Sequence, residues 1–169
     1  MDKLIDDLIK LAFAEDIGDG DHTTLCCIPE TAMGKSQLII KEDGVLAGVE
    51  MAKRIFHDFD PELKMTVFIQ DGAEVKKGDI AFVVEGKIQS LLQTERLMLN
   101  VMQRMSGIAT TTRKYAKALE GTKTHVLDTR KTTPGMRMIE KEAVRIGGGM
   151  NHRIGLFLSL IHISEPTRP

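Results

Sequence analysis

The strongest constraint on the fold is a strand–loop–helix pattern near the end of this 169-residue chain. Residues 124–127 predict a short strand, which runs directly into Asp128-Thr129-Arg130-Lys131. Thr133 can cap a helix with Pro134 at its first position, and Gly147 predicts the helix end. Its predicted buried face carries Met136, Ile139, Ala143 and Ile146. The pattern begins a βα-repeating domain.

That domain is expected to be incomplete. A βα barrel typically needs about 250 residues, with its ligand sites at the carboxyl ends of the strands. Only 62 residues (169 minus 107) follow Gly107 in this chain. We therefore expect residues 108–157 to form only the start of an α/β barrel.

The preceding residues predict an α+β domain. Apolar residues recur at helical spacing in 2–15, 49–59 and 89–119, whereas 34–41, 63–69 and 80–86 indicate strands. Short antiparallel strands with helices on one side form a sandwich. We predict this N-terminal α/β sandwich domain, including its long helix, over residues 1–107. Ser106 and Gly107 are expected to break the helix at the boundary.

Composition excludes several classes of function. The net charge of −1 argues against a general nucleic-acid binder, and no apolar run is long enough to cross a membrane. Cys26 and Cys27 are adjacent, which is typical of reduced residues rather than a disulfide. We expect a cytoplasmic protein that contacts neither nucleic acid nor membrane.

Two cationic clusters suggest a local anion site. Arg130 and Lys131 lie just past the predicted strand, and His152-Arg153 repeats the pattern where the next strand is expected. Arginine provides a planar fork for carboxylates and lysine a point charge. Solvated loop cations are the alternative interpretation. The glycines at 147–149 match no phosphate-loop or dinucleotide pattern and favour a sharp helix exit.

A polar stripe and a hairpin leave further alternatives. Gln93, Arg96, Asn100 and Gln103 recur at helical spacing on an otherwise apolar helix. They predict either a solvated face or contact with a ligand or second subunit. Residues 71–79, with Lys87 beyond, are similar to the hairpin of biotinyl or lipoyl carrier domains, although the expected context of the modified lysine is missing.

Taken together, these motifs resemble one enzyme family. The residues that carry the resemblance are Thr94-Glu95-Arg96, Leu99-Asn100, residues 106–110, residues 128–135, Glu140-Lys141, residues 147–149, Asn151-His152-Arg153, and the acidic residues 15–19 and 21–24. They resemble nicotinate-nucleotide pyrophosphorylase (carboxylating), also called quinolinate phosphoribosyltransferase, over residues 1 to about 157. The order of the DTRKTTPG and NHR blocks is highly specific.

The resemblance implies a pentosyltransferase of de novo NAD biosynthesis. Quinolinate and phosphoribosyl pyrophosphate would give nicotinate mononucleotide, pyrophosphate and carbon dioxide, with Mg²⁺. By resemblance, Arg130 and Lys131 act in catalysis. The implied quinolinate pocket comprises Arg96, Thr129, Arg130, Lys131, His152 and Arg153. Arg96 would reach the pocket of the other subunit in a homodimer.

The chain departs from the family pattern after Phe157. Residues 158–169 resemble no continuation of the family and suggest an artefactual tail. The acidic residues expected to bind Mg²⁺ lie in the missing region, so no metal ligand and no cofactor-binding residue is assigned here. We expect the chain alone to be inactive as an enzyme. The alternative hypothesis is a non-catalytic dimerisation or ligand-binding module. A biotinyl or lipoyl carrier domain is a third, less favoured hypothesis.

Overall fold

The structure, a computed structural model, describes residues 2–157. The predicted tail from Leu158 onward lies outside the described residues. Helices in the described range are α1 (Asp2–Ile17), α2 (His22–Cys27), α3 (Val49–Phe59), α4 (Ile88–Ala118) and α5 (Arg137–Ile146). Strands there are β1 (Met33–Ile39), β2 (Gly44–Val45), β3 (Lys64–Val67), β4 (Glu74–Val75) and β5 (Ile80–Lys87).

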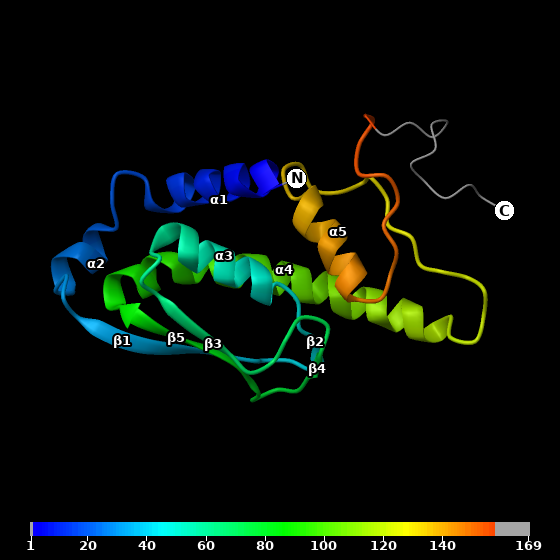
Figure 1. The fold of residues 1–169 in the computed structure, drawn as a ribbon, viewed down its shortest axis with the longest axis horizontal. Coiled ribbons are helices and arrows are strands. Elements are labelled where there is room, and N and C mark those ends of the chain that lie inside the picture. Colours follow the sequence, from blue (N-terminus) through cyan, green and yellow to red (C-terminus); the bar gives the residue numbers. More distant parts are fainter. Residues whose placement is uncertain (1, 158–169) are drawn as a thin grey trace.

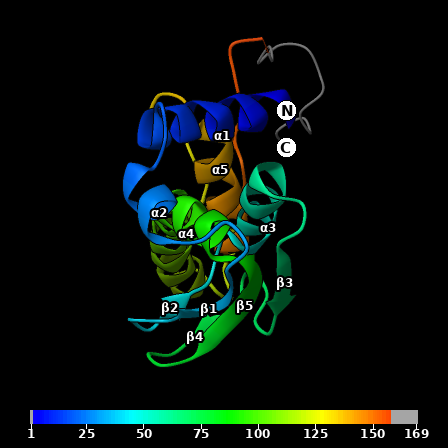
Figure 2. The same ribbon diagram turned by 90° about the vertical axis from the view of Figure 1, so that its left-hand side faces the viewer.

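An antiparallel sheet of order β1-β5-β3 forms the base of the N-terminal region. Helices α3 and α4 lie over this sheet, and α1 crosses above them (Figures 1 and 2). The central strand β5 is the most buried strand of the three, and residues 81–84 are all buried. Strands β2 and β4 form a separate two-stranded sheet. This arrangement confirms the predicted α+β sandwich.

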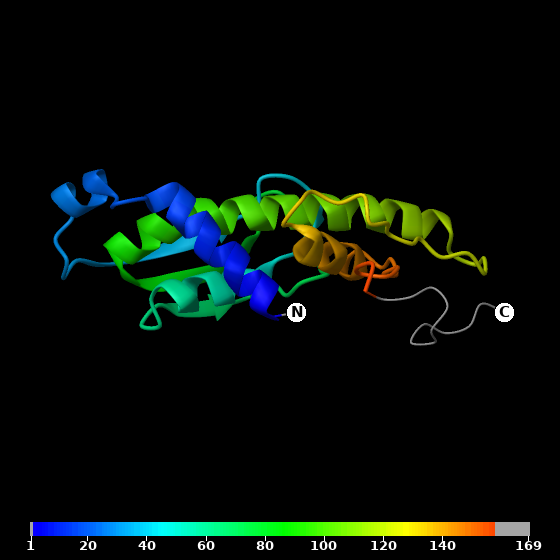
Figure 3. The same ribbon diagram turned by 90° about the horizontal axis from the view of Figure 1, so that it is seen from above.

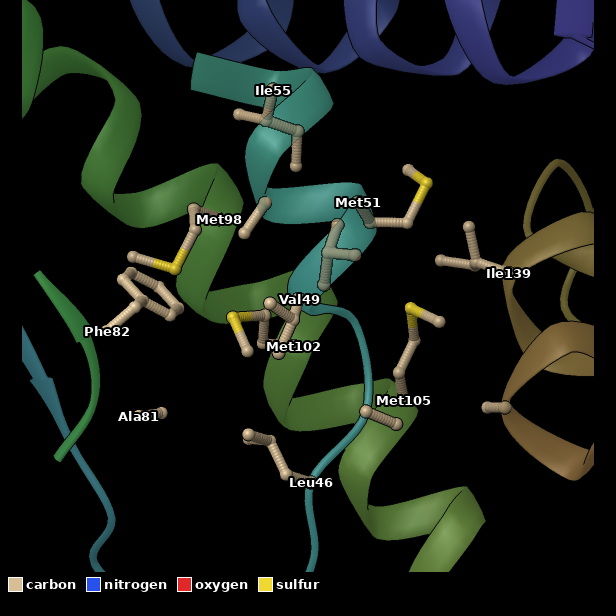
Figure 4. Packing of buried hydrophobic residues seen from close by; sticks show 14 of the residues in the cluster. Leu46, Val49, Met51, Ile55, Ala81, Phe82, Met98, Met102, Met105 and Ile139 are labelled. Carbon is tan, nitrogen blue, oxygen red and sulfur yellow. The ribbon is translucent and has the colours of Figure 1, made fainter. Parts of the chain in front are cut away.

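The core lies between the sheet and the helices. Phe82 of β5, Val49 of α3, and Met102 of α4 converge there, each at most 3% exposed (Figure 4). Met105 of α4 meets Ile139 of α5, which extends the same core toward the second region (Figure 4). Unbranched methionine side chains fill irregular gaps well, so a core without tryptophan can still pack tightly.

Helix α3 is positioned by a residue distant in the sequence. Its N-cap, Gly48, has φ of +103°, and a Cβ there would lie 3.2 Å from Met102 Cγ. Glycine provides no capping side chain, and the Val49 amide instead donates to Asp71 Oδ1 at 2.8 Å. Asp71, the first residue of the hairpin segment 71–79, therefore caps α3.

Helix α4 is a single uninterrupted helix of 31 residues, so the predicted break at Ser106 and Gly107 is wrong (Figure 3). A mid-helix glycine costs about 1 kcal/mol relative to alanine. Burial of Met105 and Ala109, 1% and 0% exposed, outweighs that cost. Ser106 Oγ accepts from the Ala47 amide at 3.0 Å, so this side chain joins the helix to the β2–α3 connection.

The region after α4 contains α5 and the first pairing of a parallel sheet. Ile139 and Ala143 are buried as predicted, and α5 packs against α4. The predicted strand at 124–127 is reduced to one parallel bridge between Leu127 and Met150. Leu127 and Met150 are both about half exposed, because no further strand flanks them within the described residues. The structure confirms the start of a βα-repeating arrangement.

The helix start at Thr133 is also corrected. Helix α5 begins at Arg137, after a turn at 134–136. Thr133 does not cap it: the Thr133 amide instead donates to Glu140 Oε2 at 3.3 Å, and its hydroxyl accepts from Arg104 Nη2 at 2.5 Å. The Thr133 amide and hydroxyl, which a capping box would use, are therefore bonded to Glu140 and Arg104 instead.

Candidate functional site

Two loops meet beyond the parallel bridge. The Met150 amide donates to the Val126 carbonyl at 2.8 Å, and the Asp128 amide donates to the Met150 carbonyl at 3.1 Å. The chain leaves these paired segments as residues 129–132, named the first loop, and residues 151–153, named the second loop. Both loops therefore emerge at the carboxyl ends of neighbouring parallel segments, where α/β barrels bind their ligands.

The first loop carries three of the predicted site residues. Thr129 Oγ1 accepts from the Lys131 amide at 3.1 Å, which closes a tight local turn. The Thr129 and Lys131 side chains are exposed, and Arg130 is half-buried. Arg130 Nε is buried and has no hydrogen-bond partner among the described residues. Buried donors without a partner are rare in folded proteins, so the Arg130 guanidinium has hydrogen-bonding capacity that the described residues do not use.

The second loop is joined to the end of the first segment. The His152 amide donates to Asp128 Oδ1 at 2.7 Å, which brings His152 and Arg153 beside the residues that precede Thr129. Both side chains are half-buried. The structure thus brings together Thr129, the two cations of the first loop and the two residues of the second.

Arg96 is not part of this group within one chain. Its side chain is exposed on α4, and no hydrogen bond or ion pair engages it in the part of the chain that the structure describes. Arg104, eight residues later on α4, bonds to Thr133, the residue that follows the first loop. At 1.5 Å per residue the two lie about 12 Å apart along the helix axis.

Sequence reasoning missed the buried charges beneath the loops. Lys141 Nζ lies 2.5 Å from Asp128 Oδ1, and their side chains are only 3% and 6% exposed. Glu140 accepts from Arg104 Nε at 2.8 Å. The available signal was the spacing of Arg137, Glu140 and Lys141 on one face of a helix whose other face is apolar.

A solvent-exposed ion pair on the same helix provides a contrast. Arg145 Nε donates to Glu142 Oε2 at 2.9 Å, and both side chains are well exposed. The hydrogen bond from Arg145 lowers the pKa of the Glu142 carboxyl below its usual value, against the opposing effect of desolvation. An exposed pair of this kind contributes little to stability, typically under about 1 kcal/mol.

An open depression of about 580 Å³ lies between α4 and residues 126–128. Its lining includes Gln103, Thr111, Tyr115 and Leu127, and apart from Arg104 and Asp128 it is uncharged. It includes none of the predicted binding residues, so the loops rather than this depression form the candidate anion site.

Other predicted classes of site find little support in the described residues. Within residues 2–157, no group of three His, Cys, Asp or Glu side chains lies together to hold a metal ion. No metal ligand is assigned among these residues, and no chemical step is assigned to Mg²⁺. Lys87 lies at the β5–α4 junction and pairs with Glu62 at 3.4 Å, rather than at a hairpin tip as in a carrier domain. No described helix is long and apolar enough to cross a membrane.

The fold is an α+β sandwich followed by the start of an α/β barrel, and two cationic loops follow the first paired parallel segments of that barrel. Residues 21–106 match the family described as Quinolinate phosphoribosyl transferase, N-terminal domain, and residues 108–163 match the C-terminal domain of the same family. The chain belongs to the quinolinate phosphoribosyl transferase family. The two matches adjoin inside the unbroken helix α4. The second extends beyond Phe157, where we predicted the family sequence to end.

Individual relatives agree with that assignment. The chain is 48% identical over 151 residues to "Quinolinate phosphoribosyltransferase [decarboxylating] 1" of Nicotiana glauca, covering 89% of this chain and 43% of the relative. It is 43% identical over 153 residues to "Probable nicotinate-nucleotide pyrophosphorylase [carboxylating]" of Synechocystis, covering 90% of this chain and 52% of that protein. The chain thus spans about half the length of these relatives.

A solved structure shows the same fold. The crystal structure of NadC from Streptococcus pyogenes superposes with a TM-score of 0.88 at 41% sequence identity, covering 92% of this chain and 55% of that chain. This similarity agrees with an N-terminal sandwich followed by the first part of a barrel.

Proposed function

We propose that this chain provides the quinolinate-binding part of a quinolinate phosphoribosyltransferase, a pentosyltransferase of NAD biosynthesis. The reaction joins quinolinate to phosphoribosyl pyrophosphate and releases pyrophosphate and carbon dioxide. The observation that carries the proposal is the meeting of two cationic loops at the ends of paired parallel segments. The family membership and the names of the relatives support it.

The charges of the loops suit a ligand with two carboxylates. The two loops carry Arg130, Lys131, His152 and Arg153. None of these side chains makes a hydrogen bond or ion pair with the described residues 2–157. Fixed cations can bind both carboxylates and orient the pyridine nitrogen toward the ribose carbon. In this proposal Arg130 and Lys131 also stabilise charge as pyrophosphate and carbon dioxide leave. Thr129 contributes a hydroxyl.

The proposal includes a homodimer in which Arg96 enters the partner's pocket. Exposure of Arg96, Asn100 and Gln103 on α4 supports contact with a second copy, as does the separation of Arg96 from the loops of its own chain. A cytoplasmic location remains part of the proposal, supported by the free, exposed Cys26 and Cys27. Mg²⁺ would be held by residues outside those described.

Calorimetric titration of quinolinate into the purified chain tests the binding. We expect binding that weakens about tenfold to a hundredfold in Arg130→Gln and in Arg153→Gln, because each loses a charge-assisted hydrogen bond. Arg145→Gln is the matched control, since Arg145 is an exposed arginine outside the loops. Nicotinate, with one carboxylate, should bind more weakly than quinolinate.

Equal affinity for the two compounds, or equal effects of all three substitutions, would contradict the proposed pocket.

A turnover assay with phosphoribosyl pyrophosphate and Mg²⁺ addresses the activity. We expect no nicotinate mononucleotide from this chain by itself, so product formation would contradict that expectation. Binding without turnover would favour the non-catalytic ligand-binding module for the isolated chain.

A further inference from the structure

One face of α5 contacts both cationic loops. Arg137, Glu140 and Lys141 follow the i, i+3, i+4 spacing that places side chains on the same side of a helix. Glu140 and Lys141 are 8% and 3% exposed, although charged residues are rarely buried unless they are paired. Each of the three is engaged by the loops or by residues that flank them.

Lys141 joins the start of the first loop to the second loop. Its ammonium donates to Asp128 Oδ1 at 2.5 Å and to the His152 carbonyl at 2.9 Å. Asp128 Oδ1 in turn accepts from the His152 amide at 2.7 Å, which closes a ring of hydrogen bonds. With the amide nitrogen of Asn151 facing the carboxylate, Asn151 also donates to Asp128 Oδ2 at 2.9 Å.

Glu140 holds the other end of the first loop. It accepts from the Thr133 amide at 3.3 Å and from Arg104 Nε at 2.8 Å, and Arg104 also reaches the Thr133 hydroxyl. The first loop is therefore fixed at Asp128 by Lys141 and at Thr133 by Glu140, two adjacent residues of α5. Arg104 connects this end of the loop to α4.

Arg137, on the same face of α5, joins the first loop to Ile154, the residue that follows the second loop. Its Nε donates to Thr132 Oγ1 at 3.0 Å, and its Nη1 donates to the Ile154 carbonyl at 3.2 Å. Its Nη2 lies 3.5 Å from the Arg130 carbonyl, at the limit of a hydrogen bond. The charges of α5 thus bind loop backbone and hydroxyl groups and leave the loop cations available.

We propose that Arg137, Glu140 and Lys141 position the cationic loops for the anionic substrate, and that Lys141 is the principal positioning residue. The inference rests on the proposed function for the identity of the ligand, quinolinate. Lys141 acts through His152 and Asp128 and does not itself touch the substrate. Substrate affinity is sensitive to such support because binding groups must be held within about 0.5 Å of their productive geometry by the residues around them.

The test compares Asp128→Asn, Lys141→Met and the combined Asp128→Asn/Lys141→Met variant of the whole chain. Removing one partner of a buried pair leaves an uncompensated charge and can unfold the protein, whereas removing both charges is tolerated far better. The combined variant therefore keeps the experiment decisive. Glu142→Gln/Arg145→Met is the matched control, because it removes an exposed ion pair from the same helix.

Amide hydrogen exchange followed by mass spectrometry is the first measurement. In the combined variant we expect exchange in residues 129–132 and 151–153 to rise about tenfold or more, while exchange in α4 stays unchanged. The control should change neither. Unchanged exchange in the loops would overturn the proposal, and a rise that extends through α4 and α5 would show a general structural role and overturn it as well.

Quinolinate titration of the same variants is the second measurement. We expect affinity to fall at least about tenfold in the combined variant and to remain unchanged in the control. If unmodified chain binds no quinolinate, the proposed function of this chain fails, and hydrogen exchange still decides whether α5 positions the loops. If the loops loosen and quinolinate affinity is unchanged, the positioning role is refuted.

Discussion

Substitution of Gly147 by alanine tests the contact between α5 and α4. Gly147 is the C-cap residue of α5, and a Cβ there would lie 2.6 Å from the Ala109 carbonyl oxygen and 2.7 Å from Thr112 Cβ. It would also lie 3.0 Å from Ala109 Cα, well inside the 3.4 Å at which ordinary contact begins. Two of these three atoms belong to the backbone of α4, so they cannot rotate away.

The backbone dihedral adds no strain to this substitution. Gly147 has φ of −69° and ψ of −7°, which alanine adopts freely. The cost therefore comes from steric overlap alone, and relief requires α5 to move away from α4. Overpacking of this kind costs about 1–3 kcal/mol, and the backbone contacts favour the upper half of that range. In a chain of this size about 2–3 kcal/mol lowers Tm by about 4–12 °C.

Gly107→Ala is the matched control and should have the opposite effect. Gly107 lies within α4, and a Cβ added there meets no atom within 4 Å among the described residues. Alanine in a helix interior should stabilise by about 0.5–1 kcal/mol relative to glycine. Urea unfolding followed by circular dichroism measures both variants. If Gly147→Ala costs no more than a few tenths of a kcal/mol, the close approach of α5 to α4 is incorrect.

Three further predictions concern the core, a helix contact and pH. Ile139→Ala should cost about 2–5 kcal/mol in urea unfolding, because Ile139 is 1% exposed, and a loss below about 1 kcal/mol would contradict that burial. Ser106→Ala should lower the free energy of unfolding by about 1–3 kcal/mol in the same assay, because it removes both hydrogen bonds to the buried backbone of Ala47. An unchanged free energy of unfolding would refute this prediction. The Ser90 hydroxyl lowers the pKa of Asp60 below 3.8, so the ionised carboxylate stabilises the fold above that pH and the effect fades as pH falls through the lowered value. Thermal melts between pH 6 and 3 should therefore show a smaller acid-induced loss in Asp60→Asn than in the unmodified chain.

The helices were predictable because their apolar periodicity is local. The prediction of 49–59 matches α3, and that of 89–119 is displaced from α4 by a single residue. The break at Gly107 was wrong because glycine is a local signal, whereas the burial of Met105 and Ala109 depends on α3 and α5. Predictions from one segment could not include that tertiary packing.

The site was predictable only in its loops. Cations after a strand indicate a ligand site because strand ends gather at one edge, and this reasoning led to Arg130, Lys131, His152 and Arg153. Their roles stay predictions. The buried charges of α5 beneath the loops were missed because their partners are distant in sequence. Arg104 and Glu140, for example, are separated by 36 positions. The spacing of Arg137, Glu140 and Lys141 indicates a polar face of α5 but does not show which distant residues pair with that face.

The continuity of α4 determines how this chain can be divided in the laboratory. The two family matches meet inside α4, so a cut at that boundary would sever a helix rather than a linker. The severed end would expose Met105 and Ala109 and would separate Arg104 from Glu140. A cut near Gly121, past the last turn of α4 and at a positive φ of 81°, would leave the helix whole. A separately expressed N-terminal region should therefore extend through residue 120. The second region would lose its packing against α4 wherever the cut is made.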